Sequence, residues 1–196
     1  MKYELTTETT TTWYGATLYR IRYIKTGELG GFIESEKNLS QEDDNAYVSG
    51  NARVFGDARV SGNAEVSGNA EVSGNARVFG DAEVFGDARV SGNARVFGDA
   101  RVSGDAEVFG DAEVFGNEWT ASPLQIMGTR FFFSVSSKNT ITVGCTTKTI
   151  EEWQVTYERE MKAHGFTEKQ RFEYKAYFNL ASSLYEWGIT LPMEEK

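Results

Sequence analysis

A six-residue repeat runs without insertion through the middle of the chain. Between Ala46 and Asn117 the sequence reads as twelve consecutive units, most of the form Ala–Arg/Glu–Val–Ser/Phe–Gly–Asn/Asp. Side chains alternate faces along a β-strand, so Ala and Val point one way while Arg/Glu and Ser/Phe point the other. Gly followed by Asn or Asp is typical of a turn, because both tolerate positive φ angles. The repeat therefore predicts short strands joined by corners, with Ala and Val filling a narrow interior.

The repeat resembles the hexapeptide repeats of left-handed parallel β-helices. In that family three hexapeptides make one triangular coil, so the resemblance implies about four coils for the twelve units. At a strand spacing of about 4.8 Å the prism would be roughly 20 Å tall. The stretches GELGGFIESEKNLSQ, VSGNARVFGDA and TITVGCTTKTIEEW are similar to those of a group of bacterial and bacteriophage hexapeptide-repeat proteins, often described as transferases or as hypothetical proteins. The resemblance indicates architecture more than activity.

We therefore expect a mainly β fold made of three parts: an N-terminal β cap over residues 1–45, a single-stranded left-handed parallel β-helix over 46–117, and a small C-terminal ββαα domain over 118–196. The caps are expected because a β-helix exposes strand edges at both ends. In the N-terminal cap, alternating aromatic and aliphatic residues from Trp13 to Tyr23 predict one or two strands. Thr9–Thr12 is either a strand or a frayed tail. Three glycines predict turns before Phe32–Ile33, namely Gly27, Gly30 and Gly31.

The C-terminal part predicts a hairpin and two helices. Thr129–Ser136 and Thr140–Gly144 are the expected hairpin strands. Each helix begins with a capping-box pattern, Thr149 with Glu152 and Thr167 with Gln170, and each is expected to end at a glycine, Gly165 or Gly188. The expected apolar faces are Ile150, Trp153, Tyr157 and Met161 for the first helix, and Phe172, Ala176, Leu180, Leu184 and Trp187 for the second. We expect this unit to pack on the last coil, since it is small to be stable alone.

An eighteen-residue coil would stack every third unit, so the outer residues can be sorted into three faces. One face carries Arg53, Glu71, Arg89 and Glu107 in alternation, which predicts a solvated structural wall. On that face Phe55 and Phe109 flank two serines and look incidental. The second face has a mixed character, with Tyr47, Glu65, Glu83 and Arg101.

The third face is the candidate interaction surface. On this face, side chains of the same charge lie above one another, which costs stability unless something neutralises them. A stripe of aromatic rings lies beside them, as is common in interaction surfaces. The residues of the face are Arg59, Arg77 and Arg95, then Glu113, with Ser61, Phe79, Phe97 and Phe115 alongside. Two interpretations stay open. The C-terminal segment or a second copy of the chain covers the face, or a different protein docks on it.

Composition excludes several functions. The formal net charge of −9 argues against direct nucleic-acid binding through phosphate contacts. A single cysteine, Cys145, and a single histidine, His164, exclude multi-Cys or multi-His metal sites, and His164 is expected to cap a helix. The acyltransferases and carbonic anhydrases built on this scaffold use histidines of the coils, and the repeat has none. We therefore expect no enzyme activity, no cofactor and no metal. The sequence contains no stretch of about 18 apolar residues, so we expect no membrane-spanning helix. We expect the protein in the cytoplasm.

These observations favour a non-catalytic binding protein that docks on another protein. Its resemblance to bacteriophage proteins suggests a phage or prophage origin, a host protein or complex as partner, and inhibition of a defence complex such as CRISPR-Cas as one role. The candidate partner-binding residues are Arg59, Arg77, Arg95, Phe79, Phe97 and Phe115. One alternative is a self-assembling structural β-helix, with a homodimer formed through the phenylalanine face. Another is a nucleotide-binding or acyltransferase-like protein.

Overall fold

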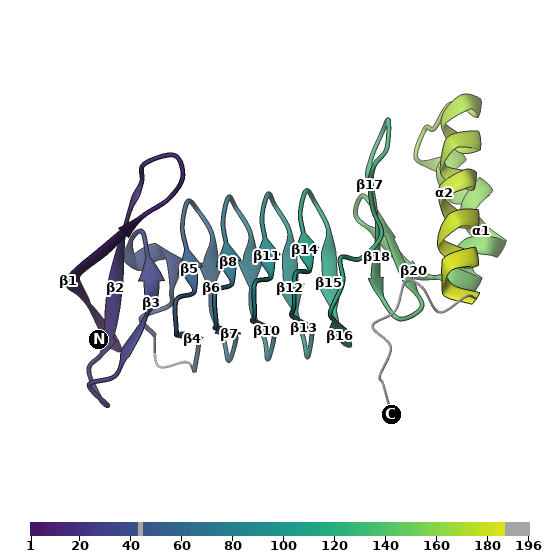
Figure 1. Cartoon of the computed structure of the whole chain (residues 1–196). Coiled ribbons are helices and arrows are strands. Elements are labelled where there is room, and N and C mark those ends of the chain that lie inside the picture. Colours follow the sequence, from purple (N-terminus) through teal and green to yellow (C-terminus); the bar gives the residue numbers. More distant parts are fainter. Residues whose placement is uncertain (43–44, 187–196) are drawn as a thin grey trace.

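The computed structural model describes residues 1–42 and 45–186 as an elongated molecule with three parts in line (Figure 1). An N-terminal sheet lies at one end, a β-solenoid forms the middle, and a second sheet with two helices lies beyond the last coil. The solenoid strands are β4 (Tyr47–Val48), β5 (Arg53–Val54), β6 (Arg59–Val60), β7 (Glu65–Val66), β8 (Glu71–Val72), β9 (Arg77–Val78), β10 (Glu83–Val84), β11 (Arg89–Val90), β12 (Arg95–Phe97), β13 (Arg101–Val102), β14 (Glu107–Val108), β15 (Glu113–Phe115) and β16 (Glu118–Trp119).

The eighteen-residue coil predicted from the repeat is confirmed. Each strand pairs in parallel with the strand three units later, as β5 does with β8 and β8 with β11. One face is the sheet β4-β7-β10-β13-β16, and another is β6-β9-β12-β15. The third face, β5-β8-β11-β14, continues into the N-terminal strands. The solenoid has about five turns, more than the repeat count alone predicts, because β3 and β16 extend it at its two ends. Its left-handed sense stays a prediction.

Close packing of small side chains fixes the coil. Every alanine and valine of the repeat is buried, and the backbone of each rung bonds to the next, as Arg77 N–H does to Ala94 O at 2.9 Å. The corners require glycine for two reasons. Gly74 has a φ of +67°, and a Cβ added there would lie 3.0 Å from the backbone nitrogen of Gly92 in the next rung. A larger residue would therefore strain the turn and separate the rungs.

Side-chain amides add a second set of bonds along the corners. Asn51 Nδ2 donates to Asn69 Oδ1 at 3.4 Å, and Asn69 Nδ2 donates to Asp87 Oδ1 at 3.1 Å. The corner that begins at Asn45 has the same form, through Asn63 to Asp81. An ionised aspartate only accepts hydrogen bonds, so these chains stop at the first aspartate.

The N-terminal cap consists of β1 (Tyr3–Thr11), β2 (Thr17–Tyr23) and β3 (Leu29–Ile33), with a short 3₁₀ helix, η1 (Glu36–Asn38), after them. Thr9, Thr10 and Thr11 of the threonine run thus lie in β1, and the prediction of one or two strands between Trp13 and Tyr23 is confirmed by β2. β1, β2 and β3 are antiparallel, and β3 then pairs in parallel with β5. A polar side chain of the cap forms hydrogen bonds with backbone groups of the first rung. Tyr23 Oη accepts from Val48 N–H at 2.8 Å and donates to Val48 O at 3.1 Å.

The prediction of turns at Gly30 and Gly31 is wrong, although Gly27 does turn the chain with a φ of +74°. Both Gly30 and Gly31 lie in β3, where the cap presses on the first coil. A Cβ at Gly30 would lie 2.7 Å from Val48 O, and one at Gly31 would lie 2.6 Å from Ala52 O. These glycines permit close backbone approach rather than a change of direction.

The C-terminal part contains a four-stranded antiparallel sheet, so the ββαα prediction missed two strands. The order is β17 (Gln125–Met127), β18 (Phe132–Ser137), β19 (Thr140–Val143) and β20 (Thr146–Thr149). The predicted hairpin is confirmed as β18–β19. The strand β17 is short and β20 is all threonine and lysine, so neither has the apolar alternation that predicts a strand.

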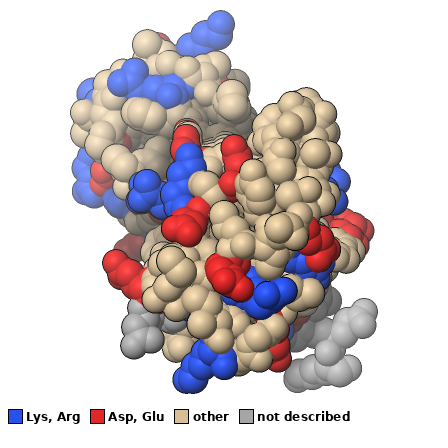
Figure 2. Space-filling view, turned by 90° about the vertical axis from the view of Figure 1, so that its left-hand side faces the viewer, with Lys and Arg blue, Asp and Glu red and all other residues tan. Residues whose placement is uncertain are grey.

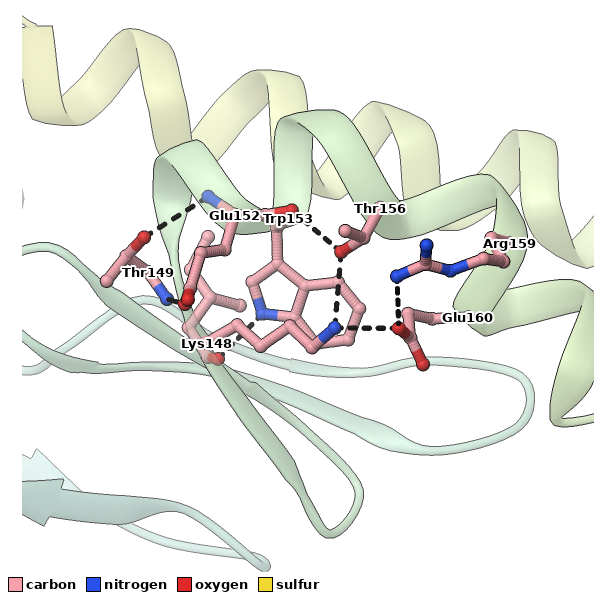
Figure 3. A network of polar contacts seen from close by, with 8 residues as sticks. Lys148, Thr149, Glu152, Trp153, Thr156, Arg159 and Glu160 are labelled. Carbon is pink, nitrogen blue, oxygen red and sulfur yellow. Dashed lines mark hydrogen bonds and ion pairs between the residues drawn. The ribbon is translucent and has the colours of Figure 1, made fainter.

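The first predicted helix is confirmed as α1 (Ile150–Ala163), with Thr149 and Glu152 forming its capping box and His164 at its C-cap. Figure 3 shows the polar contacts along this helix, where Lys148 Nζ bonds Glu160 Oε1 at 2.7 Å and lies 5.5 Å from the centre of the Trp153 ring. Hydrogen bonds from Lys148 and from Arg159 hold the pKa of Glu160 below its usual range. This network attaches β20 to α1.

The second helix, α2 (Glu168–Glu186), uses a different face from the predicted one. Phe172 is 77% exposed and Leu180 is 44% exposed, whereas Tyr174, Phe178 and Ala181 are buried. The helix buries the face that carries Tyr174 and Phe178 because this face supplies aromatic rings for packing and a hydroxyl group for hydrogen bonding. Tyr174 Oη contacts the backbone of Phe131, and Phe178 packs on the Trp153 ring at 5.0 Å. Trp187 and Gly188 lie outside the described residues.

The C-terminal part is anchored to the last coil, as expected. Gln125 bonds the edge of β14 as another strand would, with Oε1 accepting from Phe109 N–H and Nε2 donating to Glu107 O, both at 2.8 Å. Gly116 and Asn117, with φ angles of +58° and +61°, turn the chain at the end of the repeat. Within residues 1–42 and 45–186, no helix is long and apolar enough to cross a membrane.

Candidate interaction surface

The sheet β6-β9-β12-β15 carries the arginine–phenylalanine face, which we define as Arg59, Arg77, Arg95, Phe79, Phe97 and Phe115. The structure brings all six predicted residues together. Arg59 pairs in register with Arg77, and Arg77 with Arg95. The phenylalanine rings stack beside them, with centroids 5.2 Å apart between Phe79 and Phe97 and 5.3 Å apart between Phe97 and Phe115. The rings are half-buried because each covers part of the next.

The arginines of this face are only partly matched by ion pairs within residues 1–42 and 45–186. Four of the six solenoid arginines form an ion pair with a glutamate of a neighbouring rung, at 3.3 Å for Arg53–Glu71, 3.6 Å for Arg89–Glu107, 3.1 Å for Arg95–Glu113 and 3.2 Å for Arg101–Glu83. The exceptions are Arg59 and Arg77, whose side chains make no ion pair or hydrogen bond within the described residues. Both are exposed. Two like charges therefore stand one rung apart, and neither has an ion-pair partner in the part of the chain that the structure describes.

Among the described residues, the nearby acidic groups form no ion pair with these two arginines. Asp57 is bound by Lys37 Nζ at 2.8 Å; this contact is the main cause that holds the pKa of the Asp57 carboxyl below its usual range, and the charge of Arg59 adds to it. Asp81, at the following corner, accepts from Asn63 Nδ2 at 2.8 Å. The arginine–phenylalanine face thus combines two arginines that lack an ion pair within the described residues with an apolar ridge. Such a surface can hold an anionic group and an apolar group together.

The C-terminal segment does not fold back along this face in the described part of the chain. Figure 1 shows β17–β20, α1 and α2 beyond the last coil rather than beside the solenoid. Contacts of this part with the coils concern the last rungs, such as the bond from Lys138 N–H to Asn117 Oδ1 at 3.1 Å. Cover by residues 118–186, one half of the first open interpretation, therefore loses its main support, while cover by a second copy of the chain stays open.

The alternating face β5-β8-β11-β14 carries a groove that the sequence did not reveal. The groove has a volume of about 450 Å³ and lies between the N-terminal strands and the solenoid. It is lined by Thr10, Phe32, Asn51, Arg53, Asn69, Glu71, Asp87 and Arg89. Its charges are mixed, and Arg53 and Glu71 already bind each other. This arrangement agrees with a solvated wall more than with a charged binding site.

The view of Phe55 and Phe109 as incidental is wrong. Phe55 is buried with Leu18 and Phe32 under the N-terminal cap, and Tyr14 lies 6.0 Å from it. Phe109 meets the edge of the Phe132 ring of the C-terminal sheet at 6.3 Å. The two phenylalanines mark where the caps contact this face, while the serines between them lie in the open stretch. Their positions at the two ends of a serine column were the signal that could have indicated this.

The remaining candidate side chains have structural surroundings. His164 is the C-cap of α1, as expected. Cys145 is exposed, and it lines a cavity of about 30 Å³ together with His164. Within the described residues, no group of His, Cys, Asp and Glu is placed to hold a metal ion. Figure 2 shows acidic and basic side chains interspersed on the N-terminal end of the molecule.

The fold and its surfaces define the class of this chain, which is a β-solenoid repeat protein with capped ends. A family model described as the YdcK β-solenoid repeat matches residues 46–62 and 88–104. Both matched ranges lie inside the twelve units, so the similarity concerns the repeat rather than the caps. No curated protein matches the chain.

Proposed function

We propose that this chain is a non-catalytic binding protein that docks on a protein partner through the arginine–phenylalanine face. The observation that carries the proposal is the pairing of an uncompensated arginine rung with a stacked aromatic ridge on a rigid solenoid. Arginine is over-represented among the residues that contribute most to binding at protein interfaces, and phenylalanine is enriched in interfaces relative to the rest of the surface. A rigid surface also loses little conformational entropy when it binds.

The resemblance to bacteriophage hexapeptide-repeat proteins supports one choice of first partner. A host protein or defence complex, CRISPR-Cas included, is the partner class to test first. Docking of this kind requires no catalytic residue, cofactor or metal of the chain.

The experiment is affinity capture from host lysate with the tagged protein and two variants. Phe97→Glu places a charge in the middle of the ridge. Ser91→Glu introduces the same charged residue at the equivalent position of the alternating face and is the matched control. We expect a stoichiometric partner with the wild type and with Ser91→Glu, and a loss of at least about tenfold in affinity with Phe97→Glu. Circular dichroism melting shows that each variant is folded.

Two outcomes would contradict the proposal. Capture that survives in folded Phe97→Glu would remove the surface we assign. A wild-type protein that captures nothing and forms a defined oligomer sensitive to Phe97→Glu would instead assign the ridge to self-assembly.

A further inference from the structure

The unequal distribution of ion pairs on the solenoid indicates what the partner presents. Arg53, Arg89, Arg95 and Arg101 each have a glutamate in an adjacent rung, so the repeat can neutralise an arginine wherever its charged slot is filled by glutamate one coil away. At Arg77 both neighbouring slots are arginine. One neighbour, Arg95, is already bound to Glu113. The cationic excess is therefore concentrated at Arg59 and Arg77.

The geometry of this pair suits a single oxyanion. Adjacent parallel strands lie about 4.8 Å apart, so two guanidinium groups one rung apart can both donate to the two oxygens of one group placed between them. Such charge-assisted bonds are the stronger class of hydrogen bond. Phe79 follows Arg77 by two residues on the same side of the strand, and its ring stacks on Phe97. An anion held by Arg59 and Arg77 thus lies beside the start of the apolar ridge.

We propose that Arg59 and Arg77 form an oxyanion clamp that binds a side-chain carboxylate of the protein partner, next to an apolar residue that contacts Phe79. This inference rests on the proposed docking function and specifies the chemistry of the same face. A carboxylate fits better than a nucleic-acid phosphate chain for a reason of extent. Nucleic-acid binding needs a long series of cationic contacts, whereas this face has two free arginines on a protein of net charge −9.

The first test uses the free protein and inorganic sulfate as the probe. We would follow the arginine Nε–Hε signals by NMR during titration with sodium sulfate, with sodium chloride at equal ionic strength as the reference. We expect the Arg59 and Arg77 signals to shift and saturate with sulfate, while those of Arg53 and Arg89, which already bind glutamates, stay in place. Shifts of Arg59 and Arg77 no larger than those of Arg53 and Arg89 would overturn the clamp.

The second test distinguishes the source of the anion. The probes are a short peptide containing Glu next to Phe, the same peptide with Gln in place of Glu, and a single-stranded oligonucleotide. We expect the glutamate peptide to shift Arg59, Arg77 and the Phe79 ring, and the glutamine peptide to bind about tenfold more weakly. Tighter binding of the oligonucleotide than of the glutamate peptide would overturn the assignment to a protein carboxylate.

Variants separate this inference from the proposed function. Arg77→Gln keeps a polar chain but removes the charge, and Arg89→Gln is its control on the alternating face. If a partner is captured by the wild type and lost with Phe97→Glu but fully retained by Arg77→Gln, docking is correct and the clamp is wrong. If sulfate and the glutamate peptide bind Arg59 and Arg77 but Phe97→Glu retains the partner, the two arginines hold an anion, but the docking surface is wrong and the anion is not the partner's carboxylate.

Discussion

Two faces of the solenoid share one backbone and one interior, yet their outer charges follow opposite patterns. On the alternating face, Arg53 and Arg89 each bind a glutamate of the next rung. On the arginine–phenylalanine face, Arg59 and Arg77 have no such partner within the described residues. The outer slot is not constrained by packing, so either pattern is compatible with the fold. Pairing of charges between rungs does not explain Arg59 and Arg77, whereas the docking role proposed above would account for them.

The largest effect we predict tests whether the interior beneath the two faces is equivalent. Val78 lies under the arginine–phenylalanine face and Val90 under the alternating face, and both are fully buried. Val78→Ala and Val90→Ala should each lower the free energy of unfolding by about 2 kcal/mol, because each leaves a comparable cavity. Urea denaturation measures both. A difference between them larger than about 1 kcal/mol would mean that the outer pattern reflects a difference in core packing.

A smaller effect should follow from exchanging the charge patterns. Glu71→Arg puts three arginines in register on the alternating face and removes the Arg53 ion pair, so it should destabilise the protein by about 1 kcal/mol. Arg77→Glu creates alternation on the other face and should stabilise it by about 0.5 kcal/mol. Both effects should shrink in high salt, which screens exposed charges. Changes of the same sign for the two variants would show that the ladders do not control stability.

The repeat allowed the solenoid to be predicted almost completely, because a period of six fixes which residues point inward and which rungs stack. The grouping of Arg59, Arg77 and Arg95 with Phe79, Phe97 and Phe115 followed from that register alone. That these residues bind a partner stays a prediction.

The caps were harder to predict because their structure depends on contacts that no local pattern encodes. Gly30 and Gly31 resemble turn residues, but they lie in a strand because the first coil presses on them. In α2, two apolar faces compete, and the burial of Tyr174 and Phe178 depends on rings and carbonyls supplied by distant strands. Phe55 and Phe109 differ from the serines of their column only through contact with the caps.

The smallest effect we predict concerns the corners that border the two faces. Asp87 ends the chain of amide hydrogen bonds from Asn51, and Asp105 follows it in the next rung. Asp81 ends the chain from Asn45, and Asp99 follows it in the next rung. Asp87→Asn should raise the free energy of unfolding by about 0.5 kcal/mol, because the new amide donates to Asp105 and one like-charge contact is lost. Asp111→Asn is the control, since Asp111 is the last residue of its corner and accepts from Asn93.

The same change at Asp81 sharpens the comparison between the faces. Asp81 lies at the corner that follows β9, four residues after Arg77, and we expect its carboxylate to offset a small part of the arginine charge as well as to repel Asp99. Asp81→Asn should therefore stabilise the protein less than Asp87→Asn does, and the difference should disappear in the Arg77→Gln background. A double-mutant cycle of Asp81 with Arg77 measures this coupling directly. Equal gains at the two corners in the wild-type background would mean that Asp81 does not feel Arg77, and that the cationic rung is fully open to a partner.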